Sequence, residues 1–315
     1  MEEAVPEVLV LRALKLGDLL VAVPALRALG HAFPGHRITY AAPAWLGPVI
    51  ELVGGIGLLD TPGLDAPIAR AHGEVDVAVN LHGNGEQSRA RIDALGARRV
   101  IAHGADGHPG PIWEDGGHER ERWCRLLEGH GLRTDPLDVL LNRPSRPTEV
   151  PGAAVVHPGA AHGSRHWPVE RFAQVARQLE RAGHTVVVTG SADERERALA
   201  VAQAAGLGAG SVAAGQLGLE QFAALVADAR CVVSADTGAA HLASAYGVPS
   251  AVLFGPATPE AWGPPPGPHA VLTHAGLRIG DVFAEQPDPA LLAVTTEELL
   301  DALAGLGVFS AASPQ

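Results

Sequence analysis

The sequence predicts an α/β protein with two Rossmann-like domains, each built on a mostly parallel sheet, that face each other across a cleft. Short apolar runs typical of strands alternate with amphipathic patterns typical of helices along the chain, which indicates βαβ units. Each half begins with a strand that runs into a glycine, and 315 residues are enough to bury two separate cores.

The first half contains four strand-like runs and three helical patterns. The strands are predicted at residues 8–11, 37–40, 75–81 and 99–101, and the helices at residues 19–33, 44–53 and 118–130. Pro24 interrupts the first helical pattern, so that helix either bends there or begins near Val23. Residues 104–117 are rich in Gly, His, Asp and Pro, which indicates a loop.

The second half repeats the alternation after a proline-rich stretch. Residues 142–152 (NRPSRPTEVPG) hold three prolines and no apolar periodicity, so we predict one domain at residues 1–150 and another at residues 151–315. In the second domain the strands are predicted at residues 153–157, 185–189, 231–234 and 250–254, and the helices at residues 169–181, 193–205, 219–229, 239–246 and 295–306. Residues 309–315 are expected to fray.

Charge and composition exclude several classes of protein. The chain has 23 Lys and Arg against 35 Asp and Glu, and its net charge of −12 argues against binding nucleic acid or an anionic membrane by bulk attraction. Cys124 and Cys231 are too few for a disulfide framework, which favours a reducing, cytoplasmic setting. We see no secretory signal, and the longest apolar runs are too short to span a bilayer, so we expect at most peripheral contact with the inner face of the plasma membrane.

Ligands of open parallel sheets bind beyond the carboxyl ends of the strands, so the residues that follow strands are the candidates for function. Asp18 directly follows Gly17 near a helix start. In that position it either caps the helix or acts as a general base for a hydroxyl, and one carboxylate is able to do both.

The segment HPGAAHGSRHWP at residues 157–168 is suited to binding an anion. A strand ends in a turn that contains Gly159, and Arg165 stands just before a helix, so backbone N–H groups and a cation are presented together. Trp167 either forms an aromatic wall of the site or packs in the core. Two histidines stand four residues apart in this segment, but no helix is expected there and no third ligand is evident, so no metal site is predicted.

The segment SADTGAAHLASAYGVP at residues 234–249 is suited to binding a diphosphate. A strand ends, the chain turns, and a helix begins, so the hydroxyl of Thr237 and the N–H of Gly238 can both donate to an anion. Asp236 is poorly suited to touching phosphate and is expected to brace the turn or cap the helix. His241 lies one turn into the helix and is able to reach the same site. The alternative for the whole segment is a well-capped helix with no ligand.

Four segments together resemble a known family. They are VLVLRALKLGDLLVAVPALRAL, VVHPGAAHGSRHWPVERFAQVARQL, VVSADTGAAHLASAYGVPSAVLFGP and AWGP, in this order between about residues 8 and 265. In these segments the chain resembles glycosyltransferase family 9, the heptosyltransferases of bacterial surface-glycan assembly. The resemblance implies a GT-B fold, with the acceptor on the N-terminal domain, the donor on the C-terminal domain, and a last helix (residues 295–306) that crosses back to the first domain.

The resemblance also implies an inverting transfer that needs neither a metal nor a cofactor. The donor would be a nucleotide sugar such as ADP-heptose, and the acceptor a hydroxyl of a cell-surface glycan, a glycolipid or another molecule. The catalytic base falls on Asp18. The donor-binding residues implied are Gly159, Arg165, Trp167, Gly190, Glu194, Asp236, Thr237, Gly238 and His241. An acidic residue after Gly190 meets the ribose in this family, and Asp193 is an alternative to Glu194 for that contact. On the acceptor side we assign Lys15 and His82, which both follow strands.

Two other functions fit the same residues. Another GT-B enzyme, such as a nucleotide-sugar epimerase, would consume the donor without an acceptor. A non-catalytic protein that binds nucleotide sugars would have no need of the carboxylate at position 18.

Overall fold

The computed structural model describes residues 5–105 and 109–309, and the chain divides into two compact units, Met1–Asn142 and Arg143–Gln315. The division falls at the beginning of the proline-rich stretch, whereas we placed the domain boundary near its end. Most of the tail that we expected to fray, residues 310–315, lies outside the described residues. None of the helices in the described ranges has both the length and the apolar character needed to span a bilayer.

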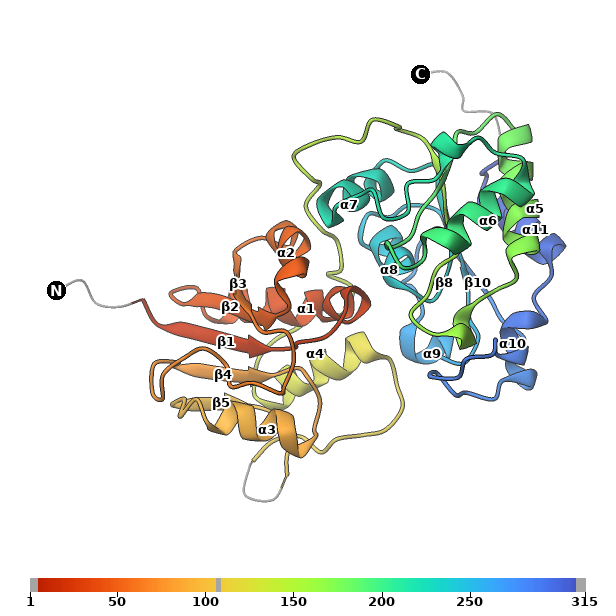
Figure 1. Ribbon diagram of the computed structural model, residues 1–315. Helices are drawn as coiled ribbons and strands as arrows, with labels where there is room; N and C mark the ends of the chain where they lie inside the picture. Colours follow the sequence, from red (N-terminus) through yellow and green to blue (C-terminus); the bar gives the residue numbers. More distant parts are fainter. Residues whose placement is uncertain (1–4, 106–108, 310–315) are drawn as a thin grey trace. The chain divides into compact units, whose positions relative to one another are not determined.

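The first unit is a five-stranded parallel sheet in the order β3-β2-β1-β4-β5 (Figure 1). Its strands are β1 (Glu7–Leu11), β2 (Arg37–Ala42), β3 (Ile56–Asp60), β4 (Val77–Asn80) and β5 (Arg99–Ile101). Leu11, at the end of β1, pairs with Ala41 on one side and with Asn80 on the other. The strand order therefore reverses between β1 and β4, and in doubly wound sheets a ligand site forms at that point, beyond the carboxyl ends of the strands.

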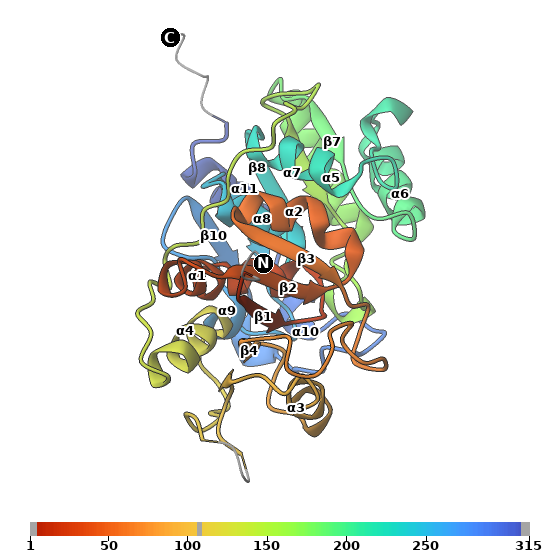
Figure 2. The ribbon, with the colours of Figure 1, turned by 90° about the vertical axis from the view of Figure 1, so that its left-hand side faces the viewer.

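Four helices and a short 3₁₀ turn cover this sheet. They are α1 (Leu16–Ala32), the turn η1 (Ala44–Leu46) followed by α2 (Gly47–Val53), α3 (Glu86–Asp93) and α4 (Glu119–Gly129). α1 packs against α4, and α3 packs against β4 (Figures 1 and 2). Ile92 of α3 belongs to the same buried apolar cluster as Leu9 and Leu11 of β1.

The start of α1 corrects one prediction. The helix begins at Leu16 and contains Pro24, so it does not begin near Val23. Lys15 is the N-cap residue, and the carboxylate of Asp18 accepts a hydrogen bond from its backbone N–H. This local bond holds the first turn eight residues before the proline, where the missing proline N–H has no influence on it.

The second unit is a five-stranded parallel sheet in the order β10-β9-β8-β6-β7. Its strands are β6 (Ala154–His157), β7 (Val186–Val188), β8 (Cys231–Ala235), β9 (Ser250–Leu253) and β10 (His269–Leu272). Here the order reverses between β6 and β8, so the ligand site of this unit is expected at the ends of those two strands.

The helices of the second unit follow the strands in alternation (Figure 1). They are α5 (Val169–Arg181), α6 (Arg195–Ala205), α7 (Leu219–Ala227), α8 (Gly238–Ala245), α9 (Pro259–Trp262), α10 (Pro289–Leu292) and α11 (Thr296–Gly305), with the 3₁₀ turns η2 (Gly163–Arg165), η3 (Ala209–Ser211) and η4 (Ala275–Leu277). The last helix, α11, was expected to cross back to the first domain. In the structure it packs in the second unit against α5, β9 and β10, and its buried Leu299 and Leu303 belong to the core of that unit.

Candidate functional site

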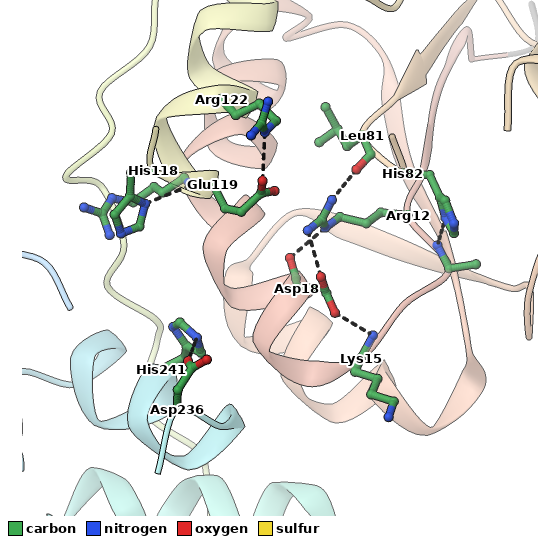
Figure 3. Close-up of polar contacts among 12 residues, drawn as sticks. Arg12, Lys15, Asp18, Leu81, His82, His118, Glu119, Arg122, Asp236 and His241 are labelled. Carbon is green, nitrogen blue, oxygen red and sulfur yellow. Dashed lines mark hydrogen bonds and ion pairs between the residues drawn. The ribbon is translucent and has the colours of Figure 1, made fainter. Parts of the chain in front are cut away.

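Asp18 lies in the first turn of α1, directly beyond the carboxyl end of β1. Its Oδ2 atom accepts a hydrogen bond from the backbone N–H of Lys15 at 3.3 Å, and its Oδ1 atom lies 3.0 Å from Nη2 of Arg12 (Figure 3). The side chain keeps 24% of its surface exposed. The capping role considered for Asp18 is therefore present, and the carboxylate still reaches solvent.

Arg12 is the residue of this site that the sequence analysis missed. Its side chain is 2% exposed and lies against the face of the Trp123 ring, with Cζ 4.6 Å from the ring centroid. Besides Asp18 Oδ1, the guanidinium donates to the backbone carbonyls of Asp18 and Leu81. A charged residue directly after four buried apolar residues was the available signal, because a cation is rarely buried without a specific partner.

His82 follows β4 at the point where the strand order reverses, and its ring is turned toward the end of β1. Its Nδ1 atom accepts a hydrogen bond from the backbone N–H of Ala13 at 3.2 Å. Burial, with a smaller effect of the Arg12 charge, lowers the pKa of His82, and the Asp18 charge opposes this shift. The ring is therefore favoured in its neutral form, with the proton on Nε2 available to a ligand. Lys15, the other residue assigned to the acceptor, has an exposed side chain.

At the corresponding place in the second unit, Thr237 and Gly238 form the start of α8, directly beyond β8. Thr237 is the N-cap residue, yet its hydroxyl does not cap the helix. The Oγ1 atom is buried and has no hydrogen-bond partner among the residues that the structure describes. A buried hydroxyl without a hydrogen-bond partner is energetically unfavourable. This hydroxyl is therefore suited to donate to a ligand that also accepts hydrogen bonds from the free N–H groups at the start of the helix.

Arg165, which ends η2 beyond β6, reaches the same turn. Its Nη1 atom donates to the carbonyl of Asp236 at 3.3 Å and lies 4.0 Å from the Asp236 carboxylate. Within the described ranges its Nε atom is buried without a partner. The other carboxylate oxygen of Asp236 lies 3.6 Å from Nε2 of His241 (Figure 3). Asp236, itself 5% exposed, thus lies between a cation and an imidazole, as a bracing residue would.

Gly159 and Gly190 make room for Glu194 at the ends of β6 and β7. A Cβ atom on Gly159 would lie 2.2 Å from the carboxyl carbon of Glu194, and one on Gly190 would lie 3.1 Å from the Cβ of Glu194. The Glu194 carboxylate accepts a hydrogen bond from the backbone N–H of Ser191 at 2.7 Å. Asp193 is exposed, whereas Glu194 is half-buried over the strand ends. Of the two acidic residues, Glu194 is therefore the one that lies over the end of the sheet.

Trp167 does not belong to a ligand site. Its side chain is fully buried, stacks edge-on against Phe172 at 5.0 Å, and donates its indole N–H to the carbonyl of Val294 at 3.0 Å. The assignment of Trp167 to the donor is wrong, because every part of this side chain is already used in the core of the second unit. The core-packing alternative is the one observed.

The chemistry available at these positions follows from the groups present. The first unit offers a partly exposed carboxylate and a neutral imidazole, which suit the binding and deprotonation of a hydroxyl. The second unit offers an arginine, a free hydroxyl and a helix start, which suit a diphosphate. In the described part of the chain, no group of three or more His, Cys, Asp or Glu side chains is arranged to hold a metal ion.

A family model matches a stretch of the chain that covers much of the second unit. Residues 141–275 match the model of glycosyltransferase family 9 (heptosyltransferase). The matched stretch contains Arg165, Glu194 and the turn at Thr237, and it ends before α10 and α11.

Two relatives extend the comparison. Lipopolysaccharide heptosyltransferase 2 of Salmonella typhimurium is 31% identical over 161 residues, which are 47% of this chain and 45% of that protein. Lipopolysaccharide heptosyltransferase 1 of Pseudomonas aeruginosa is 28% identical over 299 residues, which are 80% of this chain and 79% of that protein. The match to the Salmonella relative thus spans less than half of that protein's length.

Solved structures share the fold of nearly the whole chain. A family 9 glycosyl transferase from Veillonella parvula has a TM-score of 0.79 at 22% identity, over 97% of this chain and 98% of that one. The ADP-heptose lps heptosyltransferase II of E. coli has a TM-score of 0.72 at 20% identity, over 97% and 100%. The iron-containing dodecameric glycosyltransferase TibC of E. coli has a TM-score of 0.62 at 14% identity, over 97% and 76%. These likenesses confirm the predicted α/β class and the GT-B fold.

Proposed function

We propose that this chain is an inverting glycosyltransferase that moves a heptose from ADP-heptose to a hydroxyl of a cell-surface glycan. The match of residues 141–275 to the model of glycosyltransferase family 9 and the similarity to heptosyltransferases support this proposal. The Salmonella and Pseudomonas relatives are lipopolysaccharide heptosyltransferases by name, and the name of the E. coli enzyme includes ADP-heptose. The acceptor that we propose first is therefore lipopolysaccharide or a similar glycan.

The buried hydroxyl of Thr237 is the observation that carries the proposal. It stands at the start of α8 without a partner among residues 5–105 and 109–309, beside an arginine whose Nε atom is also unpartnered there. A nucleoside diphosphate supplies acceptor oxygens for both groups, and its negative charge is stabilised by the helix start and by Arg165.

In the proposed reaction the acceptor oxygen attacks the anomeric carbon in one displacement, which inverts the configuration there. Asp18 takes the proton of the attacking hydroxyl. The bond from the anomeric carbon to the diphosphate breaks, and the bonding electrons leave with ADP. Arg165 and the start of α8 stabilise the charge that builds on the leaving diphosphate. This positive charge is what supports a transfer without a divalent metal.

Binding of ADP tests the donor half of the proposal. By isothermal titration calorimetry, Arg165→Ala should weaken ADP binding by about 10- to 100-fold, as expected when a charged hydrogen bond worth about 1.5–3 kcal/mol is lost. Arg181→Ala is the matched control, because Arg181 is an exposed arginine in the last turn of α5. Equal ADP affinity of the Arg165→Ala variant and the parent would remove Arg165 from the donor site.

A transfer assay tests the acceptor, the inversion of configuration and the independence from a metal. The protein is incubated with ADP-heptose and lipopolysaccharide from a heptose-deficient strain, with and without EDTA, and the products are analysed by mass spectrometry and NMR. We expect an acceptor that is heavier by one heptose, with the anomeric configuration inverted, and an equal rate in EDTA. Loss of the rate in EDTA would overturn metal independence alone. Conversion of the donor to an isomer in the absence of acceptor would instead identify an epimerase.

A further inference from the structure

We propose that Arg12 is a positioning residue that makes the two carboxylate oxygens of Asp18 unequal and leaves Oδ2 as the atom that receives the proton of the acceptor hydroxyl. The inference rests on the proposed function. Arg12 belongs to neither the donor-binding nor the acceptor-binding residues assigned from the sequence. The inference also specifies which oxygen of Asp18 takes the proton.

Arg12 binds the same residue at two points. Its Nε atom donates to the backbone carbonyl of Asp18 at 2.8 Å, and its Nη2 atom donates to the Oδ1 atom of Asp18 at 3.0 Å. The third nitrogen donates to the carbonyl of Leu81, which follows β4. Because a guanidinium is planar and rigid, these three bonds fix the side-chain rotamer of Asp18 relative to both the start of α1 and the end of β4.

Trp123 lies against the guanidinium. The indole of Trp123, on α4, is 1% exposed, and the centre of the Arg12 guanidinium lies 4.6 Å from its ring centroid. α4 packs against α1, the helix that carries Asp18. A ring on one face and three carbonyl or carboxylate oxygens at the edge leave the guanidinium one orientation, so its hold on Asp18 is rigid.

The two oxygens of Asp18 therefore differ. Oδ1 accepts a charge-assisted hydrogen bond from Arg12, whereas Oδ2 accepts a longer bond, 3.3 Å, from the neutral N–H of Lys15. A charge-assisted bond is roughly twice as strong as a neutral one, so it withdraws more electron density from Oδ1. Oδ2 is the more basic oxygen, and the side chain that carries it is 24% exposed.

The proton transfer is then defined atom by atom. The O–H bond of the acceptor breaks, its proton moves to Oδ2, and the acceptor oxygen forms the new bond to the anomeric carbon while ADP departs with its bonding electrons. Arg12 touches neither the substrate nor the reacting atoms. It acts by keeping Oδ2 in place.

The first test is Arg12→Lys, which keeps the positive charge but loses the planar three-point contact. We expect kcat to fall by about 10- to 100-fold, the loss typical of a misplacement of about 1 Å at a reacting group. The KM for ADP-heptose and the affinity for ADP should stay within twofold of the parent. Arg120→Lys is the control, because Arg120 is a second buried arginine, on α4, and no hydrogen bond or ion pair joins it to Asp18. This variant should keep the parent kcat. An unchanged kcat in Arg12→Lys would overturn the inference.

The second test separates positioning from a structural role. In an Asp18→Asn background, the residual rate should not fall further when Arg12→Lys is added, because there is no basic oxygen left to position. An equal fractional loss in both backgrounds would show that Arg12 acts only through folding. If Arg12→Lys does not fold, Trp123→Phe serves instead, with a smaller expected loss of about 2- to 10-fold in kcat and the same dependence on Asp18. These outcomes are read against a parent that transfers heptose, so failure of the proposed function itself is seen separately.

Discussion

Asp18 combines two roles in one carboxylate. It accepts a hydrogen bond from the backbone N–H of Lys15, the N-cap residue of α1, and it forms an ion pair with the buried Arg12. A substitution that removes both roles would confuse loss of stability with loss of catalysis, so the choice of variant decides what an experiment on this residue can show.

Asp18→Asn retains a carbonyl oxygen for the cap but cannot take a proton. We expect the transfer rate to fall by about 10²- to 10⁴-fold, the range of a general base, with ADP affinity close to that of the parent. The unfolding midpoint should fall, because asparagine has one acceptor oxygen where Asp18 accepts from both Lys15 and the buried Arg12. Asp65→Asn, which changes an exposed aspartate of the same unit, should leave all three quantities unchanged. Transfer by Asp18→Asn at the parent rate would show that another group takes the proton.

The hydroxyl of Thr237 offers a second variant at a single atom. Thr237→Val keeps the shape of the side chain and removes the unpartnered Oγ1 atom. If this hydroxyl donates to a diphosphate oxygen, ADP affinity should fall by about 10-fold, which corresponds to a hydrogen bond to a charged group. Thr185→Val, at an exposed threonine before β7, is the control in the same calorimetric titration. An affinity unchanged by Thr237→Val would mean that the hydroxyl is satisfied by water.

The position of a single residue in the fold was predictable where a sequence motif fixes it. It was not predictable where contacts between distant parts of the chain fix it. Asp18, Arg165 and Thr237 all follow strands, so sequence order alone placed them at the carboxyl edge of a sheet. Arg12 was missed because its partners, Leu81 and Trp123, are distant in the sequence and meet it only through the strand order. Trp167 was assigned wrongly because a tryptophan beside a loop gives no sign of which way its ring turns.

Among the elements, those with a marked apolar pattern were predicted and those without one were missed. α5 alternates apolar and charged residues at helical spacing, and it was placed correctly. Ile92 is the one large apolar residue of α3 (EQSRARID), so the apolar periodicity of this helix is too weak to detect. β3 and β10 are short edge strands that are only partly buried, and edge strands need less apolar character than central ones.

The loop between β6 and α5 depends on one large side chain. Trp167 ties this loop to the core and to the carbonyl of Val294, next to α11. Trp167→Phe should therefore lower the free energy of unfolding by about 1–3 kcal/mol in urea titrations, through lost packing volume and one lost hydrogen bond.

Trp45→Phe is the comparison for that measurement. Trp45 is 52% exposed in η1, so its substitution should change the free energy of unfolding by less than about 0.5 kcal/mol. Equal effects of the two substitutions would contradict the core role of Trp167.

The whole molecule consists of two units with separate sheets, and this division predicts which unit a bound nucleotide stabilises. ADP at 100 times its dissociation constant should stabilise the unit that binds it by about 2.7 kcal/mol. In hydrogen exchange followed by mass spectrometry, we expect added ADP to slow exchange in the second unit, above all after β6 and β8. Protection confined to the first unit would contradict the assignment of the donor.

The stability of the first unit depends on pH through the buried carboxylate of Glu7. Glu7, 3% exposed in β1, accepts hydrogen bonds from Arg70 and from Thr39. Burial alone would raise the pKa of Glu7, but the hydrogen bonds and charge of Arg70, with Thr39 and Arg37, lower it below its ordinary value of 4.5. The unfolded chain therefore takes up this proton first as the pH falls.

It follows that the stabilisation from Glu7 is complete above the ordinary carboxyl pKa and is lost as the pH falls from about 4.5 toward the lower folded value. Glu7→Gln should remove this part of the acid sensitivity, so that its melting temperature changes less than that of the parent between pH 5 and pH 3. Glu51→Gln, at an exposed glutamate of α2, should follow the parent curve. Parallel curves for Glu7→Gln and the parent would contradict the assignment.

Lys15 is the only lysine among the 23 basic residues, the others being arginine, and its side chain is exposed at the N-cap of α1. Apart from the α-amino group, a reagent that acylates primary amines therefore has one side chain to modify, three residues from Asp18. A fluorophore attached there would report from the rim of the first-unit site without any cysteine being introduced. An immobilising resin coupled through amines would, for the same reason, hold the protein by the very edge at which its acceptor is proposed to bind.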